Sequence, residues 1–171
     1  MYDWIQGRPP ILMRERDLGD WPGGDLPKKR TGPFAKIEQF AGFPTLVLRE
    51  SELTTIVPLE LGGVLLVTAI YCDGDREVAA HLDLLPIAGW EPLTERFRAL
   101  DDTYALFDAS LTGRDLRDPS KKRKIREEHG GVIRFSMEAG LYEIETLGPW
   151  NPDPRTELYL TRMIRVTSTQ L

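Results

Sequence analysis

The chain has 171 residues and a mass of 19.4 kDa; 41% of its residues are hydrophobic and 29% are charged. This length suits one domain, 1–171, and the composition is globular rather than disordered, fibrous or membrane-spanning. The longest apolar run, Val64 to Cys72, is about half of the ~20 residues that a spanning helix needs. Because the N-terminus lacks the regions of a secretory signal, we expect a cytoplasmic protein.

Charge is unevenly distributed beneath the formal net charge of −5. Residues 41–113 hold twelve acids against four arginines, whereas residues 114–134 hold eight Lys and Arg against four acids. If the acidic segment folds onto one face, its field would attract a cationic partner and repel nucleic acid. Ordinary solubilising charge is the alternative interpretation. The basic run 121–126 is interpreted as a solvated loop, with phosphate contact as its alternative.

The first 44 residues contain six prolines and six glycines, which exclude long regular elements. We therefore expect a wrapped N-terminal arm over 1–44. Within it, the pattern predicts short strands over 10–13 and 35–40 and a helical turn over 16–20.

The middle of the chain predicts paired strands and a central strand. Residues 45–48 and 54–57 are short β-rich runs on either side of a charged turn, which predicts a hairpin. The segment 64–72 is nearly continuous in apolar and β-branched residues, so we expect a strand covered on both faces. Its lone cysteine, Cys72, is expected to be a buried small hydrophobe rather than a reactive thiol.

An amphipathic helix is predicted over 76–85. Asp73 and Asp75 supply capping chemistry before it, Glu77 lies in its first turn, and Pro86 ends it. Its apolar face is formed at i, i+4 and i+7 by Val78, Leu82 and Leu85. We predict no other helix.

The second half alternates with period two. A hairpin is predicted over 93–99 and 104–109, with its turn at Asp101 and Asp102. Residues 111–131 lack apolar periodicity and predict a long exposed basic loop, followed by strands over 132–137, 141–147 and 157–166. The fold class is therefore mainly β (α+β), with antiparallel sheets or a sandwich, one amphipathic helix and a Pro/Gly-rich arm.

Recognised motifs of catalysis and cofactor binding are absent from the sequence. It has no nucleophile elbow, phosphate-binding loop or dinucleotide fingerprint. The Asp73–Glu77 segment resembles the opening of a calcium loop but lacks its sixth-position glycine and twelfth-position glutamate. The two histidines, His81 and His129, lack nearby cysteines. We expect no catalytic residue, no cofactor and no metal.

In the order and spacing of several segments, the chain resembles family twenty-one of the immunity proteins of bacterial polymorphic-toxin systems. The resemblance spans nearly the whole chain. It rests on Trp4-Ile5, Pro10-Ile11-Leu12-Met13, Leu18-Gly19-Asp20-Trp21, Thr45-Leu46-Val47-Leu48 with Thr54-Thr55, Gly63 to Tyr71, Trp90-Glu91-Pro92, Leu106-Phe107-Asp108-Ala109 with Gly113, Ala139-Gly140-Leu141-Tyr142, and Asp153, Thr156 and Leu158-Tyr159-Leu160. The chain departs from the family pattern at Gly7-Arg8-Pro9-Pro10 and Pro33-Phe34-Ala35-Lys36-Ile37.

The resemblance implies a small cytoplasmic, non-catalytic inhibitor that binds a cognate toxin domain and occludes its active site. Together with the acidic segment it suggests a cationic partner, neither nucleic acid nor membrane. Because turns and caps project charge outward and buried aromatics dominate interfaces, the candidate partner-binding residues are Asp73, Asp75, Glu77, Trp90, Asp101, Asp102 and Trp150. The alternative is a β-rich small-molecule-binding protein or a hydrolase whose site is assembled from residues distant in sequence.

Overall fold

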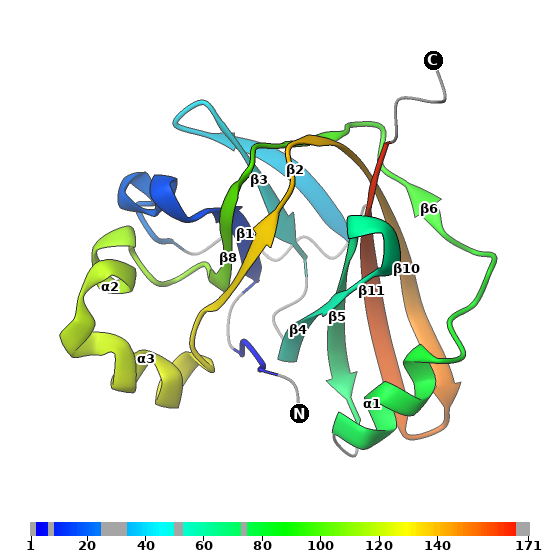
Figure 1. Cartoon of the computed structure of the whole chain (residues 1–171). Coiled ribbons are helices and arrows are strands. Elements are labelled where there is room, and N and C mark those ends of the chain that lie inside the picture. Colours follow the sequence, from blue (N-terminus) through cyan, green and yellow to red (C-terminus); the bar gives the residue numbers. More distant parts are fainter. Residues whose placement is uncertain (1–2, 7–8, 25–33, 50–52, 73–74, 167–171) are drawn as a thin grey trace.

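Two antiparallel sheets form the molecule (Figure 1). The computed structural model describes residues 3–6, 9–24, 34–49, 53–72 and 75–166. One sheet contains β1 (Pro10–Arg14), β2 (Ala35–Phe40), β3 (Phe43–Leu48), β8 (Asp102–Asp108) and β9 (Ile133–Met137), in the order β2–β3–β1–β8–β9. The mainly β fold class is confirmed.

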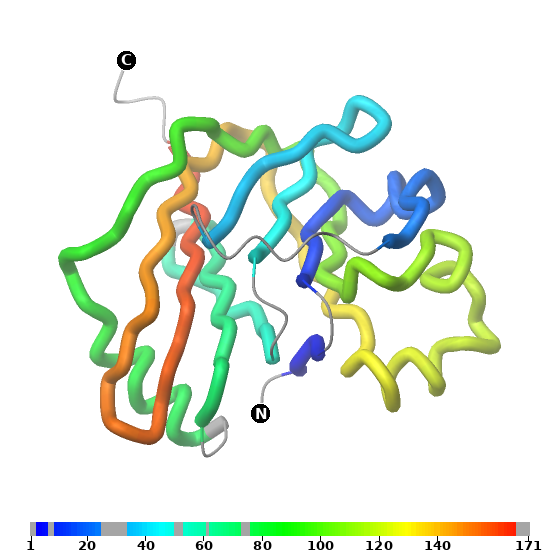
Figure 2. Tube along the Cα trace, turned by 180° about the vertical axis from the view of Figure 1, so that it is seen from behind, coloured from blue at the N-terminus to red at the C-terminus, as the bar shows by residue number. Residues whose placement is uncertain are grey.

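The second sheet has six strands. They are β4 (Leu53–Pro58), β5 (Val64–Tyr71), β6 (Glu91–Pro92), β7 (Phe97–Ala99), β10 (Gly140–Asp153) and β11 (Thr156–Arg165). Five follow the order β4–β5–β11–β10–β6, and β7 also pairs with β10. Figure 2 shows β10 and β11, orange and red, running side by side.

Short helices and 3-10 turns flank the sheets. They are α1 (Asp75–Leu82), α2 (Gly113–Arg117), α3 (Lys122–His129), and the 3-10 turns η1 (Glu15–Asp20), η2 (Glu60–Gly62) and η3 (Pro119–Lys121). In Figure 1, α1 lies at the end of the six-stranded sheet, and α2 and α3 lie beyond the five-stranded sheet. Among the described residues, no helix has both the length and the apolar character to cross a membrane.

The alternation along β5 explains why its sheet has an apolar layer on each face. Val64 and Leu66 point into the core between the two sheets, where they join side chains of β1, β3, β8 and β10. Leu65, Val67 and Ala69 point the other way, toward Val78 of α1. The strand predicted to be covered on both faces is thus confirmed.

The five-stranded sheet follows the same rule. Tyr104 and Leu106 of β8 join the core between the sheets, while Ala105 and Phe107 pack into a second cluster with Trp21. That cluster is closed by side chains of η1, α2 and α3. The molecule is therefore a sandwich whose two outer faces are both partly covered.

The structure corrects two expectations about segments. Within the expected arm, 1–44, the predicted strands over 10–13 and 35–40 and the helical turn over 16–20 are confirmed as β1, β2 and η1. β1, however, pairs with both β3 and β8, so this segment supplies an internal strand of a sheet and not only an outer wrapping. The expected exposed loop 111–131 instead contains α2, η3 and α3. The sequence pattern does not predict these short helices, because only three large apolar side chains there are buried, those of Leu111, Leu116 and Ile125, too few to show a period.

Two predicted hairpins are also wrong. β3 and β4 lie in different sheets, and so do β7 and β8, so the turns between them carry the chain across the sandwich. Alternation shows which face of a strand is apolar, but strands of both sheets turn one face to the same shared core, so the pattern does not select the partner. The strands predicted over 141–147 and 157–166 are confirmed as parts of β10 and β11, which pair as an antiparallel hairpin, and α1 is confirmed but ends at Leu82 rather than 85.

Substitution of Leu66 tests the shared core. Leu66 is fully buried, so Leu66→Ala should lower the free energy of unfolding by about 2–5 kcal/mol through lost burial and a residual cavity. The control is Leu100→Ala, because Leu100 is 47% exposed and should change stability by less than about 1 kcal/mol. Urea denaturation measures both, and equal small losses would contradict the central position of β5.

Candidate functional site

The chain after α1 folds into a fixed loop on the outer face of the six-stranded sheet. We call residues 84–90 the Ile87 loop. The Trp90 indole N–H donates a hydrogen bond to the Pro86 carbonyl at 2.8 Å, which closes the loop on itself. Gly89 has φ of +90°, a backbone conformation that favours glycine. The loop is therefore closed by a hydrogen bond between two of its own residues.

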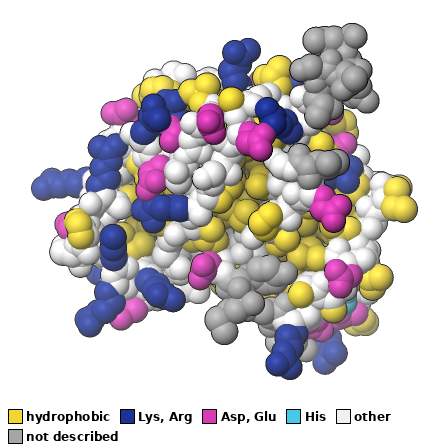
Figure 3. All heavy atoms as spheres, in the orientation of Figure 1, with side chains coloured by type: hydrophobic (Ala, Val, Ile, Leu, Met, Phe, Trp, Pro, Cys, Tyr) yellow, Lys and Arg dark blue, Asp and Glu magenta, His cyan; other side chains and the backbone are white. Residues whose placement is uncertain are grey.

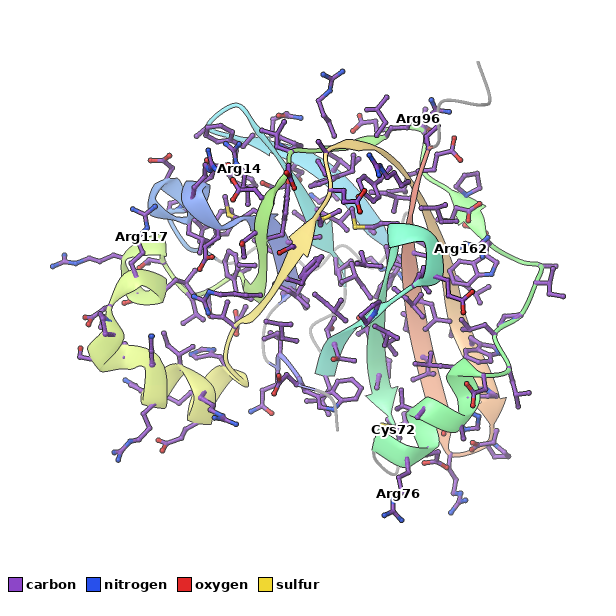
Figure 4. The ribbon with its side chains drawn as sticks, viewed as in Figure 1. Arg14, Cys72, Arg76, Arg96, Arg117 and Arg162 are labelled. Atoms are coloured by element: carbon purple, nitrogen blue, oxygen red, sulfur yellow. The ribbon has the colours of Figure 1, made fainter. Side chains whose placement is uncertain are left out.

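An arginine from the sheet supports this loop. The Arg162 guanidinium carbon lies 4.1 Å from the centre of the Trp90 ring, a cation–π contact, and Arg162 also forms an ion pair with Glu145 of the neighbouring strand. Figure 4 labels Arg162 near the segment that carries β6. Trp90 is thus held by Pro86 at its indole nitrogen and by Arg162 over the face of its ring.

A small cavity lies beside Trp90. Its volume is about 260 Å³, and it is lined by Leu59, Glu60, Gly63, Leu65, Leu85, Trp90, Arg162, Ile164 and Arg165. Both lining arginines have carboxylate partners, since Arg165 pairs with Glu138 and Arg162 with Glu145. Glu60 is therefore a negative group beside an otherwise charge-balanced apolar hollow.

Large apolar side chains of the Ile87 loop, and one that lines the hollow, are exposed to solvent. Ile87 is 97% exposed and Leu84 is 73% exposed, while Ile164 on β11 is 41% exposed. Exposed acids adjoin them in the sequence at Asp83 and Glu91. A fixed apolar projection with an acidic surround is typical of a protein-interaction surface, because ordering it at an interface costs little further entropy.

The opposite side of the molecule is basic. In Figure 3, Lys and Arg side chains gather over α2 and α3. Part of this charge is compensated on α3 by Arg123 with Glu127 at 3.5 Å and Lys124 with Glu128 at 3.8 Å. The basic side chains of α2 and α3 therefore lie on the other side of the sandwich from the Ile87 loop, beside which Glu60, Asp83 and Glu91 add negative charge.

A lysine on the basic side also lowers the pKa of a neighbouring carboxyl group, that of Asp115. The Lys121 ammonium, together with hydrogen bonds from Thr112, lowers the pKa of Asp115 to about 2. Asp115 completes the capping box of α2 with Thr112, so it stays ionised where it stabilises the start of this helix.

Two of the predicted partner-binding residues, Glu77 and Trp150, belong to elements of the six-stranded sheet and its outer layer, as the Ile87 loop does. Glu77 lies on α1, and Trp150 on β10 packs edge-on against His81 with ring centres 6.4 Å apart. Trp150 and Trp90 both pack on the apolar cluster beneath α1. Asp73 and the side chain of Asp75 lie outside the described residues.

The other two predicted acids lie elsewhere. Asp101 is exposed in the turn that precedes β8, whereas Asp102 is only 16% exposed and forms an ion pair with Arg16. Arg14 also lies 3.9 Å from Asp102, and it binds Asp17 through two hydrogen bonds of 2.6 and 2.9 Å. Asp102 therefore belongs to a local charge network, and the structure does not bring it to the Ile87 loop.

A serine, a histidine and an aspartate also lie close together, but not in the order of a catalytic triad. His129 Nδ1 lies 2.8 Å from Asp108 Oδ2, while the Ser110 hydroxyl donates to Asp108 Oδ1 at 2.7 Å. In a triad the imidazole contacts the nucleophile, and here the carboxylate does. Asp108 is 1% exposed, so this arrangement satisfies a buried charge.

Sequence reasoning missed the most exposed members of the surface, Leu84 and Ile87. The available signal was a pair of large apolar residues on either side of the helix-ending Pro86, in a segment without strand alternation. Trp90 was singled out correctly as a tryptophan in a loop, although its contacts with Pro86 and Arg162 required the fold.

Comparisons with known proteins add no relative. The sequence matches no family model, and neither the curated proteins nor the solved structures give a significant match.

The support of the Ile87 loop can be measured by a double-mutant cycle. Trp90→Phe removes the indole donor and weakens the cation–π contact, and Arg162→Lys removes the planar group that stacks on the ring. We expect each change to lower the free energy of unfolding by about 1–2 kcal/mol, with a coupling of about 0.5–1 kcal/mol. Urea denaturation of the four proteins provides the values, and strict additivity would refute the contact.

Proposed function

We propose that this protein is a non-catalytic immunity protein that binds and neutralises a cognate bacterial toxin domain. The observation that carries the proposal is the Ile87 loop, whose 97% exposed isoleucine is presented by a backbone closed through Trp90 and Pro86. An apolar side chain held in water by a fixed loop is costly for an isolated protein and useful for one that inserts it into a partner.

The charge distribution supports a cationic partner. Glu60, Asp83 and Glu91 lie in or beside the Ile87 loop surface, and the basic helices lie on the far side of the sandwich. Such a separation orients an approaching cationic domain toward the acidic side and raises its association rate. Neutralisation would follow by steric occlusion of the toxin active site, in the cytoplasm and without a cofactor.

The resemblance of the segment order to the polymorphic-toxin immunity proteins supports the same proposal. Two of its segments border the surface: Trp90-Glu91-Pro92 ends the Ile87 loop, and Leu158-Tyr159-Leu160 lies on β11 beneath it.

The second candidate function is small-molecule binding or hydrolysis, which the cavity beside Trp90 favours. Its volume of about 260 Å³ lies just under the ~300 Å³ at which ordinary ligand pockets begin. Apolar walls and two arginines would suit a small ligand. Both arginines already have carboxylate partners, however, and this makes protein binding the better supported function.

Binding to the toxin domain encoded beside this chain, made catalytically inactive, tests the proposal. Ile87→Asp should weaken affinity at least tenfold, about 1.4 kcal/mol, because it places a charge at the centre of the contact. The matched control is Leu100→Asp, which alters an exposed leucine outside the Ile87 loop and should leave affinity unchanged. Surface plasmon resonance gives the dissociation constants.

The same measurement at low and high salt tests the role of charge. Asp83→Asn combined with Glu91→Gln should slow association at low salt, whereas Asp101→Asn combined with Asp102→Asn should have a smaller effect. A wild-type association rate that does not change with salt concentration would refute electrostatic steering. No binding to the neighbouring toxin, or equal binding by Ile87→Asp, would favour the small-molecule function.

A further inference from the structure

Two carboxylates and an imidazole meet where α1 packs against the β10–β11 turn. A carboxylate oxygen of Glu77, a ring nitrogen of His81 and a carboxylate oxygen of Asp153 all lie within 4.8 Å of one another. Glu77 and His81 are four residues apart on α1, so their side chains share one helix face. Asp153 comes from the end of β10, so a long-range contact completes the cluster. These are established ligand types for divalent first-row metals.

Other side chains hold two of these groups in place. Asp153 Oδ1 accepts a hydrogen bond from the Arg155 amide at 2.6 Å, and its Oδ2 accepts one from the hydroxyl of fully buried Thr156 at 3.0 Å. The His81 ring packs edge-on against Trp150. Such outer contacts are what orient metal ligands in established sites, because they fix a ligand before the ion arrives.

His81 and Asp153 present their donor atoms to each other. Nε2 lies 2.7 Å from Asp153 Oδ2, a contact that is an ion pair when the imidazole is protonated. A neutral imidazole nitrogen and a carboxylate oxygen are both metal donors, so the same two atoms can bind one ion in place of this contact. In tetrahedral zinc sites, with bonds of about 2.0–2.2 Å, neighbouring donors are roughly 3.4 Å apart.

We propose that Glu77, His81 and Asp153 bind one Zn²⁺ ion. Two carboxylates balance the charge of the ion, the imidazole supplies its preferred nitrogen donor, and a fourth position stays open to water or a side chain of a partner. Side-chain movements of about 1 Å bring the three donors to bonding distance. The ion ties α1 to the β10–β11 turn and thereby fixes the helix that precedes the Ile87 loop. This site stands independently of the proposed toxin binding.

Calorimetric titration of the tag-free full chain with ZnCl₂ at neutral pH tests the site. The wild type should bind one ion per chain. His81→Gln and Asp153→Asn should each lower the affinity at least tenfold. His129→Gln is the matched control, because it removes the other imidazole that contacts a carboxylate, Asp108, and should bind Zn²⁺ as the wild type does.

Titration with Co²⁺ reports direct ligation through visible absorption bands, which should be present in the wild type and in His129→Gln and lost in His81→Gln. Circular dichroism establishes that each variant is folded, and the near-isosteric Asp153→Asn preserves the test if His81→Gln does not fold. Absence of one-to-one binding in the wild type, or wild-type affinity in both His81→Gln and Asp153→Asn, would overturn the assignment.

Discussion

The structure depends on strands whose two faces are both apolar. β5 presents Leu66 to the core between the sheets and Leu65 to the outside, and both side chains are buried. Burial of such a strand stabilises the protein only if something covers each face, since an exposed apolar face forfeits about 25 cal/mol for every Å² left in water. On the outer face, α1 and the chain that follows it provide the cover, and this requirement fixes where they lie.

That covering layer generates both proposed sites. Trp90 covers the outer face and bonds back to Pro86, so the short connection between them turns Ile87 outward. The same packing sets α1 against the β10–β11 turn, which brings His81 to Asp153 although 72 positions separate them in the numbering. The proposed interface anchor and the proposed metal ligands are therefore both placed by the packing of this layer on the sheet, and a substitution that disturbs the layer should affect both.

Local and periodic features were predictable from the sequence, and sheet partnership was not. The continuous apolar run of β5 predicts a strand buried on both faces, and the 3.6-residue pattern of α1 predicts a helix with one apolar face. The structure confirms both elements. The turn at Asp101 was interpreted as a hairpin, but it carries the chain from one sheet to the other, which alternation does not distinguish because both sheets share a core. Trp90 was found as an aromatic residue in a loop. The nearness of Asp153 to His81 arises only from tertiary packing.

Hydrogen–deuterium exchange of the chain alone and in complex with a catalytically inactive toxin domain, as the proposed partner, tests the central claim most directly, because it locates the contact without substituting any residue. The account predicts that protection on binding concentrates in residues 83–93 and the adjoining part of β11, while α2 and α3 exchange as in the free protein. Protection confined to α2 and α3, with residues 83–93 unchanged, would contradict it.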